Sequence, residues 1–392
     1  MWATAAGAET ILQDFQIDRV RGFLPTRDPA TSLPGEFSAW EQATAEIPKF
    51  LVAGRIRSAV RDLPLIHASS LTDIRLVERA MLLLSYLAHA YVFGGDGPEP
   101  HLPAAIAVPW YHVANLLGRP PVLSYASHAL ANWRRYDPDG EIRLGNIARL
   151  QNFWGGGDED WFVLVHVAIE GQAAPALLAV LQAQAAVVQN SPEELGAALS
   201  VIASTLRRLL GILRQMPEKC DPYIYYSRVR PFIFGWLDNP GLPEGAYYEG
   251  VAEYGDRPQK FRGETGAQSS IIPSIDALCG IDYSKDVLGE HLYQLRAYMP
   301  RPHREFISHV EKGPSVRSYI NQKRIPVAVE AYNECVEALR DFRAQHLEFA
   351  GLYIHAQTQR GSANPVAIGT GGTPFMKYLN AHCNALDEYL LR

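Results

Sequence analysis

The chain has 392 residues, of which 47% are hydrophobic, and its formal net charge at pH 7 is −6. This length and apolar content are enough for a sizeable core spread over about two or three domains, which indicates a globular protein. Because no cluster of basic residues offsets the acidic balance, we do not expect nucleic acids or anionic membranes as partners.

The apolar segments and the cysteines predict a soluble, cytoplasmic protein. The first residues, MWATAAGAETILQDF, lack the basic start and long apolar run of a signal peptide, and the most apolar stretch, residues 80–93, is too short to span a bilayer. Cys220, Cys279, Cys335 and Cys383 form no CxxC pair and accompany no histidine pair at zinc-ligand spacing. They are predicted to be reduced thiols in the core.

In chain order, proline-punctuated sequence at 9–50 predicts a wrapping segment of extended stretches and turns around a short helix at 37–47. Residues 71–94 predict a long apolar helix that begins at a Thr-Asp cap, and a second helix follows the Pro-Pro pair of RPPVLSYASHALANW. Together these elements predict a small, mainly helical domain over residues 1–150.

The stretch NFWGGGDEDW has three consecutive glycines followed by three acids. This composition is typical of an interdomain connection or a mobile loop, so we predict a linker at 151–160 and a larger domain at 161–392. Residues 161–189 are apolar and Ala-rich, which favours a helix. Ser191 is the expected N-cap of the next helix, because a proline and then a capping-box glutamate follow it.

Helical periodicity continues along the rest of the chain. Further helices are predicted at 284–298, 301–311 and 327–355, and strand patterns of period two are nearly absent. The fold class is therefore predicted to be all-α. The helix after Ser191 should bury a stripe at helical spacing, namely Leu195, Leu199, Ile202, Leu206, Leu209 and Leu213.

The last long helix carries two polar residues on its apolar face. Arg343 and His346 continue the three- and four-residue steps of Tyr332, Val336 and Leu339, so both should point inward. On periodicity alone a buried histidine is favoured to be a core residue satisfied by a neighbour. A buried arginine one turn earlier, however, needs an anionic partner, and a haem propionate would supply one.

Other candidate residues also have two interpretations. In YYSRVRPFIFGW the pattern favours a helix end whose Arg228 and Arg230 reach solvent, and an aromatic-walled carboxylate pocket is the alternative. His166, in an apolar segment, is favoured to be a satisfied core histidine. The Gly-rich stretches FRGETGAQSS and GTGGT lack the features of a phosphate loop and predict surface loops or a lid. No catalytic acid-base motif is recognisable, which favours a cofactor.

Several longer stretches occur in one order from near residue 20 to the C-terminus. They are FLPTRDP, AVPWYHVANLLGRPPVLSYASHALANW, YYSRVRPFIFGW, YEGV, FRGETGAQSSIIPSIDALCGI, YMPRPHREFI, RAQHLEFAGLYI and GTGGTPFMKYL. This ordered set resembles the indoleamine 2,3-dioxygenase family. The resemblance implies a large helical domain that holds haem b, with the smaller N-terminal domain capping its distal side.

The resemblance also implies an activity. A haem-dependent dioxygenase of this kind would insert O2 across the indole C2–C3 bond of L-tryptophan, or of another indoleamine, to give N-formylkynurenine. It would need a reductant and would be a monomer or weak homo-oligomer. The alternatives are an oxygenase that acts on a different indole in secondary metabolism and a haem-based sensor without turnover.

Site residues follow from the resemblance position by position. His346 matches the proximal haem ligand, Arg343 lies beside a propionate, and Arg230 pairs with the substrate carboxylate. His166 stands where animal members have a small hydroxyl residue, and we predict that it binds the indole N–H. Tyr225 adds a hydroxyl where relatives usually have phenylalanine. The remaining substrate-contacting residues are Tyr125, Phe162, Tyr226, Gly266, Ala267, Gly369, Thr370 and Gly371.

Overall fold

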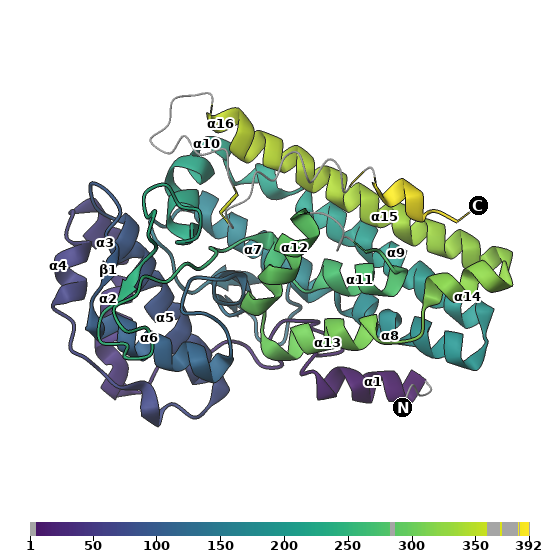
Figure 1. Cartoon of the computed structure of the whole chain (residues 1–392), viewed down its shortest axis with the longest axis horizontal. Coiled ribbons are helices and arrows are strands. Elements are labelled where there is room, and N and C mark those ends of the chain that lie inside the picture. Colours follow the sequence, from purple (N-terminus) through teal and green to yellow (C-terminus); the bar gives the residue numbers. More distant parts are fainter. Residues whose placement is uncertain (1–4, 283–286, 359–368, 371–382, 384, 392) are drawn as a thin grey trace.

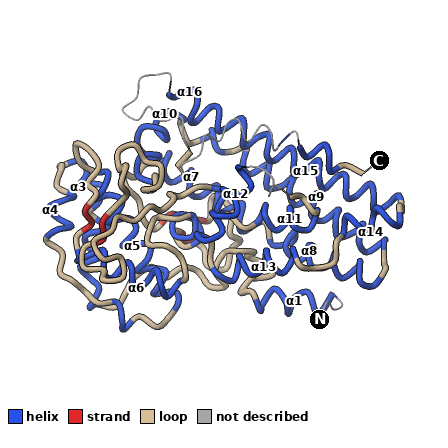
Figure 2. The backbone as a smooth tube through the Cα atoms, viewed as in Figure 1, coloured by secondary structure: helices blue, strands red, loops and turns tan. Residues whose placement is uncertain are grey.

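Helices make up nearly all the regular structure in the part of the chain that the computed structural model describes (Figure 2). That part comprises residues 5–282, 287–358, 369–370, 383 and 385–391. Its strands are short, with β1 parallel to β4 and β2 antiparallel to β3. Their bounds are β1 His101–Leu102, β2 Trp133–Arg135, β3 Ile147–Arg149 and β4 Tyr247–Tyr248. The predicted all-α class is confirmed.

Most helices from the first third of the chain gather at one end of the molecule, around α5 and α6 (Figure 1). α5 begins where predicted, because the Asp73 carboxylate accepts a hydrogen bond from the Arg75 backbone N–H as an N-cap. The bounds are α1 Ala5–Asp14, η1 Gly35–Phe37, α2 Ser38–Ala45, α3 Ile47–Val52, α4 Ile56–Arg61, η2 Ala68–Ser70, α5 Ile74–Phe93, α6 Ala104–Leu117 and η3 Ala126–Leu130.

The other end is a bundle in which α9 packs along α15 and against α8 (Figure 1). The predicted leucine stripe of α9 is buried throughout. The bounds are α7 Gly157–Gln172, α8 Ala174–Gln189, α9 Pro192–Leu213, η4 Met216–Glu218, α10 Pro222–Ile224, η5 Tyr225–Val229, η6 Arg230–Ile233, η7 Gly266–Gln268, α11 Ile271–Cys279, α12 Val287–Leu295, η8 Arg296–Tyr298, α13 Arg301–Glu311, α14 Val316–Lys323, α15 Pro326–Ala350, η9 Gly351–His355, α16 Ala356–Thr358 and η10 Leu386–Tyr389.

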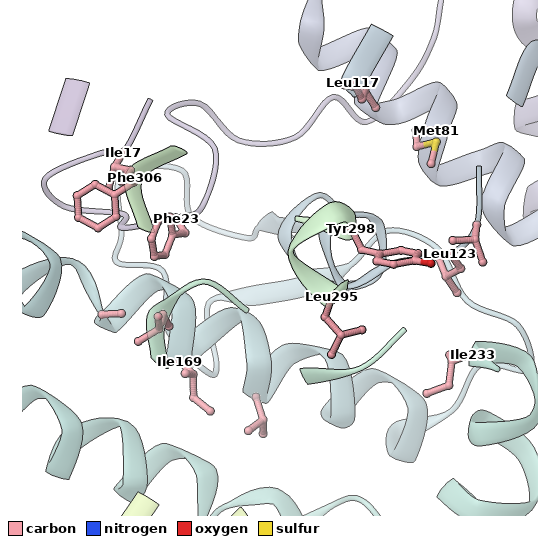
Figure 3. Close-up of a cluster of buried hydrophobic side chains, with 14 of the residues drawn as sticks. Ile17, Phe23, Met81, Leu117, Leu123, Ile169, Ile233, Leu295, Tyr298 and Phe306 are labelled. Carbon is pink, nitrogen blue, oxygen red and sulfur yellow. The ribbon is translucent and has the colours of Figure 1, made fainter. Parts of the chain in front are cut away.

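One hydrophobic core joins the two ends of the molecule. Figure 3 shows side chains of this core from segments far apart in the sequence, among them Met81 of α5 and Phe306 of α13. Phe23 of the N-terminal segment meets Phe306 edge to face, with ring centroids 5.9 Å apart. Burial of one such ring stabilises the fold by about 2 kcal/mol. The predicted wrapping segment is therefore anchored in the core.

Some local predictions were wrong. Residues 9–14, expected to be extended, belong to α1, which lies against α8. The sequence RPPVLSYASHALANW forms only the short π turn η3. Some of its backbone N–H groups bond to distant side chains instead. The Leu123 N–H donates to His89 Nε2, and the Tyr125 N–H donates to Gln268 Oε1. Tertiary hydrogen bonds thus replace the helix that local sequence favoured.

Helix ends also differ from the predictions. The run at 161–189 is two helices, α7 and α8, because Pro175 lies in the first turn of α8 and cannot donate a backbone hydrogen bond. The last long helix ends at Ala350 and continues as the π turn η9. Ser191 is the N-cap of α9, but its side chain makes no capping hydrogen bond.

The expectation that the most apolar stretch is too short to span a membrane was wrong, because α5 runs over 20 residues. By length and composition, three helical stretches of the described chain could cross a bilayer, namely Ile74–Phe93, Gly157–Gln189 and Pro192–Glu218. In the folded chain the most apolar part of each stretch is largely buried inside the protein, 83% of it in the first stretch, 78% in the second and 56% in the third. Their apolar side chains therefore contribute to the core.

The predicted linker at 151–160 is bonded to the helix that follows it. α7 begins at Gly157, so the three acids lie in its first turn. Buried Glu159 accepts hydrogen bonds from the backbone N–H groups of residues 153–155 and pairs with Arg149 at 2.7 Å. Burial acts to raise the pKa of Glu159, but Arg149 and these bonds hold it below its usual value. The domain boundary near residue 150 stays a prediction.

Candidate functional site

A cavity of about 900 Å³ lies between α7, α9, α11, α12 and α15. Its walls are largely apolar, and a space of this size accommodates a cofactor or a comparably large ligand. Six of the residues predicted to form the site line this cavity, namely Tyr125, His166, Gly266, Ala267, Arg343 and His346.

His346 presents its imidazole to the cavity from α15. His346 is exposed, and it lines this cavity instead of being packed in the core. Its depth in the protein, together with the charges of His166 and Arg343, lowers the pKa of His346 to about 4. The ring is therefore neutral at pH 7 and offers a nitrogen lone pair to a metal ion. The core-histidine interpretation was wrong.

Arg343, one turn earlier on α15, has an anionic partner within the protein. Its Nη2 donates to Oδ2 of Asp276 on α11 at 2.6 Å. The argument that this arginine needs a ligand anion was therefore wrong, because Asp276 supplies the charge. Burial raises the pKa of the Asp276 carboxyl even though Arg343 opposes the shift. Arg343 also lines the cavity, so it can contact a ligand and Asp276 together.

His166, on α7, lies on the wall of the same cavity. Its Nδ1 lies 2.7 Å from the carbonyl oxygen of Phe162, which can only accept, so Nδ1 carries the proton. Burial lowers the pKa of His166, which keeps the ring neutral and leaves Nε2 as an acceptor. That nitrogen lies near Gly266, where an added Cβ would be 3.7 Å away. His166 therefore has one satisfied nitrogen and one acceptor beside the loop at the cavity wall.

Aromatic rings surround His166. Tyr125 meets it edge-on with centroids 5.8 Å apart, and Phe162 lies 4.7 Å from it. Phe162 in turn lies 4.6 Å from Tyr225, which contacts Tyr353 at 5.7 Å. Burial raises the pKa of Tyr225, so its phenol stays neutral. Phe162 and Tyr225 are not part of the cavity lining; Phe162 contacts the lining residue His166, and Tyr225 lies behind Phe162.

A buried carboxyl group, Glu170, supports this wall. It accepts hydrogen bonds from the hydroxyl groups of Tyr125 at 3.0 Å and Ser269 at 2.6 Å, and both donors line the cavity. Burial raises the pKa of Glu170 to about 7, although the two hydrogen bonds lower it. Glu170 thus holds a hydroxyl from each of two segments at the cavity wall.

The sequence YYSRVRPFIFGW forms the π turn η5 and the short helix η6. Arg228 is exposed, but Arg230 is fully buried, so the solvent-reaching interpretation was wrong for Arg230. The Arg230 guanidinium lies over the rings of Tyr226 at 5.2 Å and Phe234 at 5.1 Å. Burial lowers its pKa. Neither Arg230 nor Tyr226 lines the cavity.

The stretch FRGETGAQSS is only partly a surface loop, because Gly263, Glu264, Gln268 and Ser270 are buried. Gly263 passes so close to Gly235 that a Cβ on either would lie 2.2–2.3 Å from the other's backbone nitrogen, which requires glycine at both positions. The Glu264 N–H donates to the carbonyl oxygen of Ile233 at 3.0 Å. This contact holds the loop of Gly266 against η6.

The stretch GTGGT contacts the same loop through Thr370. Thr370 is buried, and its hydroxyl donates to the carbonyl oxygen of Glu264. The Gly235 N–H donates to the Thr370 carbonyl oxygen at 3.4 Å. Gly369 is adjacent, whereas Gly371 lies outside the described residues, as do the other glycines of the predicted lid.

Sequence reasoning missed His128, Glu170, Glu264 and Asp276. Each is buried at or near the site, and each contacts a residue from a distant part of the chain. No local motif marks them. A buried acid within an apolar helix, as at Glu170, was the one available signal.

Comparison with known proteins identifies the family. A model of the family described as indoleamine 2,3-dioxygenase matches residues 11–385. The chain belongs to the indoleamine 2,3-dioxygenase family. Indoleamine 2,3-dioxygenase 1 of Rattus norvegicus is 37% identical, over 99% of this chain and 97% of its own length. Indoleamine 2,3-dioxygenase 2 of Homo sapiens is 34% identical, over 94% and 93%. The 6-hydroxytryptophan 2,3-dioxygenase of Fusarium equiseti is 32% identical, over 97% and 98%.

The resemblance drawn from the ordered motifs is therefore confirmed, and the chain is a member of a family of haem-dependent dioxygenases that use O2. The residues around the cavity fit haem. Neutral imidazole is a common axial ligand of haem iron, and His346 offers one. Leu209, Leu213 and Phe342 provide apolar surface for the ring system, and Arg343 provides a cation for a carboxylate at its edge.

Proposed function

We propose that the protein inserts both atoms of O2 across the indole C2–C3 bond of L-tryptophan and so forms N-formylkynurenine. The observation that carries the proposal is the neutral imidazole of His346, which faces a cofactor-sized cavity in a chain of this family. In the proposal His346 would hold the haem iron, and Arg343 would pair with a carboxylate of the bound haem. Bound haem would supply the ferrous iron that activates O2.

His166 orients the indole ring. Its Nε2 is an acceptor at the cavity wall, and the N–H of an indole is a donor without acceptor capacity. A hydrogen bond between His166 and the indole N–H fixes the orientation of the indole ring within its own plane. Such positioning places the C2–C3 bond where the reaction occurs and reduces the entropy cost of bringing the indole and O2 together.

The aromatic residues keep the reacting bond dry. Tyr125, Phe162 and Tyr225 form a largely buried wall, and the raised pKa values of Tyr125 and Tyr225 keep both phenols neutral. Exclusion of water limits proton leakage to reactive intermediates. The reaction needs no strong general base, which agrees with the lack of an acid-base motif in the sequence.

We infer that the amino-acid end of the substrate is held by Arg230, with Tyr226 beside it. Arg230 is a buried cation that follows Tyr225 on the next turn of chain. Because Arg230 is buried and does not line the cavity, the chain around it must rearrange before the substrate carboxylate reaches it. Gly266 and Ala267 bound the pocket through their backbone, and Thr370 and Gly369 lie over the amino-acid end of the substrate. Gly371, which was predicted to act with them, lies outside the described residues.

The proposal is tested by reducing the haem-loaded protein without O2, then adding O2 with L-tryptophan and following absorbance of N-formylkynurenine. Steady formation of this product supports the proposal. An oxidised indole without a formyl group indicates an oxygenase of another type. A stable oxygen complex without product indicates a sensor, and either of these two results contradicts the proposal.

A substituted indole is a second candidate substrate. Tyr225 brings a hydroxyl group into the aromatic cluster at a position predicted to cover the indole. In addition, one relative with 32% identity carries the name 6-hydroxytryptophan 2,3-dioxygenase. The same assay with ring-substituted tryptophans compares the two candidates, because the preferred substrate gives the higher kcat/KM.

A further inference from the structure

Two buried polar side chains, His128 and Glu264, face each other beside the aromatic cluster. His128 belongs to the π turn η3, which follows Tyr125, and Glu264 precedes the turn at Gly266–Gln268. Nδ1 of His128 lies 3.6 Å from Oε1 of Glu264, and their side chains are 1% and 2% exposed. This distance is too long for a direct hydrogen bond.

The described part of the protein does not meet the hydrogen-bonding capacity of His128. Neither ring nitrogen of His128 has a hydrogen-bond partner among the residues that the structure describes. Nearly all buried polar groups have a partner, and leaving one unmet costs about 1–3 kcal/mol. A polar atom of a bound molecule placed beside both side chains would satisfy one nitrogen of His128 and bond to Glu264 at the same time, after a small outward movement of either side chain.

The pair lies directly beside the rings that would hold an indole. The His128 ring centroid is 6.1 Å from that of Phe162, which lies between His128 and both His166 and Tyr225 in the chain of ring contacts. Phe162 and His166 are only partly buried. The charge of Glu264 also acts to raise the pKa values of His166 and Tyr225. The pair is therefore within electrostatic reach of the ring-binding region.

The chemistry of the pair selects among polar groups. A carboxylate accepts, and an imidazole N–H donates. A hydroxyl group both donates and accepts, so it can serve Glu264 and His128 at once. An ammonium group only donates and would leave the imidazole N–H unmet, and a C–H bond of an unsubstituted ring would satisfy neither residue.

We propose that His128 and Glu264 form a subsite for a hydroxyl group on the benzo ring of the indole substrate. This inference rests on the proposed function, because it names the class of indole that the site takes. The hydroxyl donates to the Glu264 carboxylate and accepts from the His128 ring. A site built for such a contact disfavours the analogue that lacks it, since the buried His128 imidazole then stays unsatisfied.

Isothermal titration calorimetry of the haem-loaded protein tests the subsite, with L-tryptophan and its benzo-ring hydroxy derivatives as ligands. In the wild type at least one hydroxy derivative binds about tenfold more tightly than L-tryptophan. His128→Leu and Glu264→Gln each reduce that preference to less than about threefold. His303→Leu is the matched control, because His303 is a buried histidine of α13 whose Nδ1 also lacks a hydrogen-bond partner among described residues. This control keeps the preference.

Equal affinities of the wild type for all these ligands would overturn the subsite, as would variants that weaken every ligand equally. Glu264→Gln preserves the shape of the side chain, so it decides the matter if His128→Leu does not fold. Product formation is followed separately. Failure to open the ring of any indole contradicts the proposed function, while conversion of L-tryptophan with no binding preference contradicts the subsite alone.

Discussion

At the scale of single residues, the site depends on which nitrogen of each histidine is available. His346 and His166 are both neutral, but they differ in what they offer. His346 presents its ring to the cavity, whereas the Nδ1 of His166 is already bonded to the Phe162 carbonyl oxygen. The first is therefore suited to bind a metal ion and the second to accept a hydrogen bond from a substrate.

His166→Ala should weaken the binding of L-tryptophan by about tenfold, because it removes the acceptor for the indole N–H. The binding of 1-methyltryptophan, which has no N–H to donate, should change by less than about threefold. Titration of each ligand into the haem-loaded protein measures both. His112→Ala, at an exposed position of α6, is the control and should change neither affinity. Equal losses for the two ligands would refute this role of His166.

The sequence could predict that Arg343 and His346 share the inner face of one helix, because that follows from spacing alone. It could not predict that Arg343 pairs with Asp276, which lies on a different helix. The burial of Arg230 was missed for the same kind of reason. The aromatic rings that cover it are local, but only the packing of η5 and η6 against the rest of the chain removes it from solvent.

At the scale of elements, the start of α7 shows how one side chain can fix a glycine-rich segment. Composition predicted a linker at 151–160, and the glycines do adopt backbone conformations with positive φ at Gly155 and Gly156. Composition could not show that Glu159 bonds back to three backbone N–H groups and to Arg149. Long helices such as α9 and α15 were predictable, because their periodicity extends over many turns.

Glu159→Gln should lower the free energy of unfolding by roughly 3 kcal/mol at pH 7, because it removes the buried charge partner of Arg149 and leaves only the more exposed Asp160, 2.8 Å from the guanidinium. The folded pKa of Glu159 lies below its unfolded value, so its contribution is present above the unfolded pKa and is lost as pH falls. The difference between wild type and variant should therefore shrink below about pH 4.

Urea unfolding at several pH values measures this effect. The control is Glu194→Gln, which changes an exposed acid in the first turn of α9 and should alter stability by less than about 0.5 kcal/mol. A difference between Glu159→Gln and the wild type that does not depend on pH would contradict the charge-pair explanation.

At the scale of the whole molecule, the cavity forms where α7 and the loop at Gly266 meet the bundle of α9, α11 and α15. Hydrophobic pattern identified most of these helices, but not how they are arranged. That arrangement depends on contacts that join distant segments. Examples are the ring contact of Phe23 with Phe306 and the hydrogen bonds that Tyr125 and Ser269 donate to Glu170.

Glu170 should make the stability of the whole protein depend on pH. Its pKa in the folded protein is about 7, above the usual value of 4.5 that applies to the unfolded chain. The protonated form therefore stabilises the fold fully below about pH 4.5, and this contribution is lost as pH rises through 7. Relative to Glu170→Gln, the wild type should lose on the order of 3 kcal/mol of unfolding free energy between pH 5 and pH 8. Parallel stability curves for the two proteins over this range would contradict the assigned pKa.

The proposed activity depends on His346 as the residue that holds the haem. The most direct measurement is titration of the haem-free protein with haem, followed by its absorbance, for wild type, His346→Ala and His355→Ala. His355 is exposed on the π turn that follows α15 and serves as the control. We expect His346→Ala to lose at least about a hundredfold in haem affinity, while the control binds as the wild type does. A His346→Ala protein with wild-type affinity and an unchanged haem spectrum would contradict this role of His346.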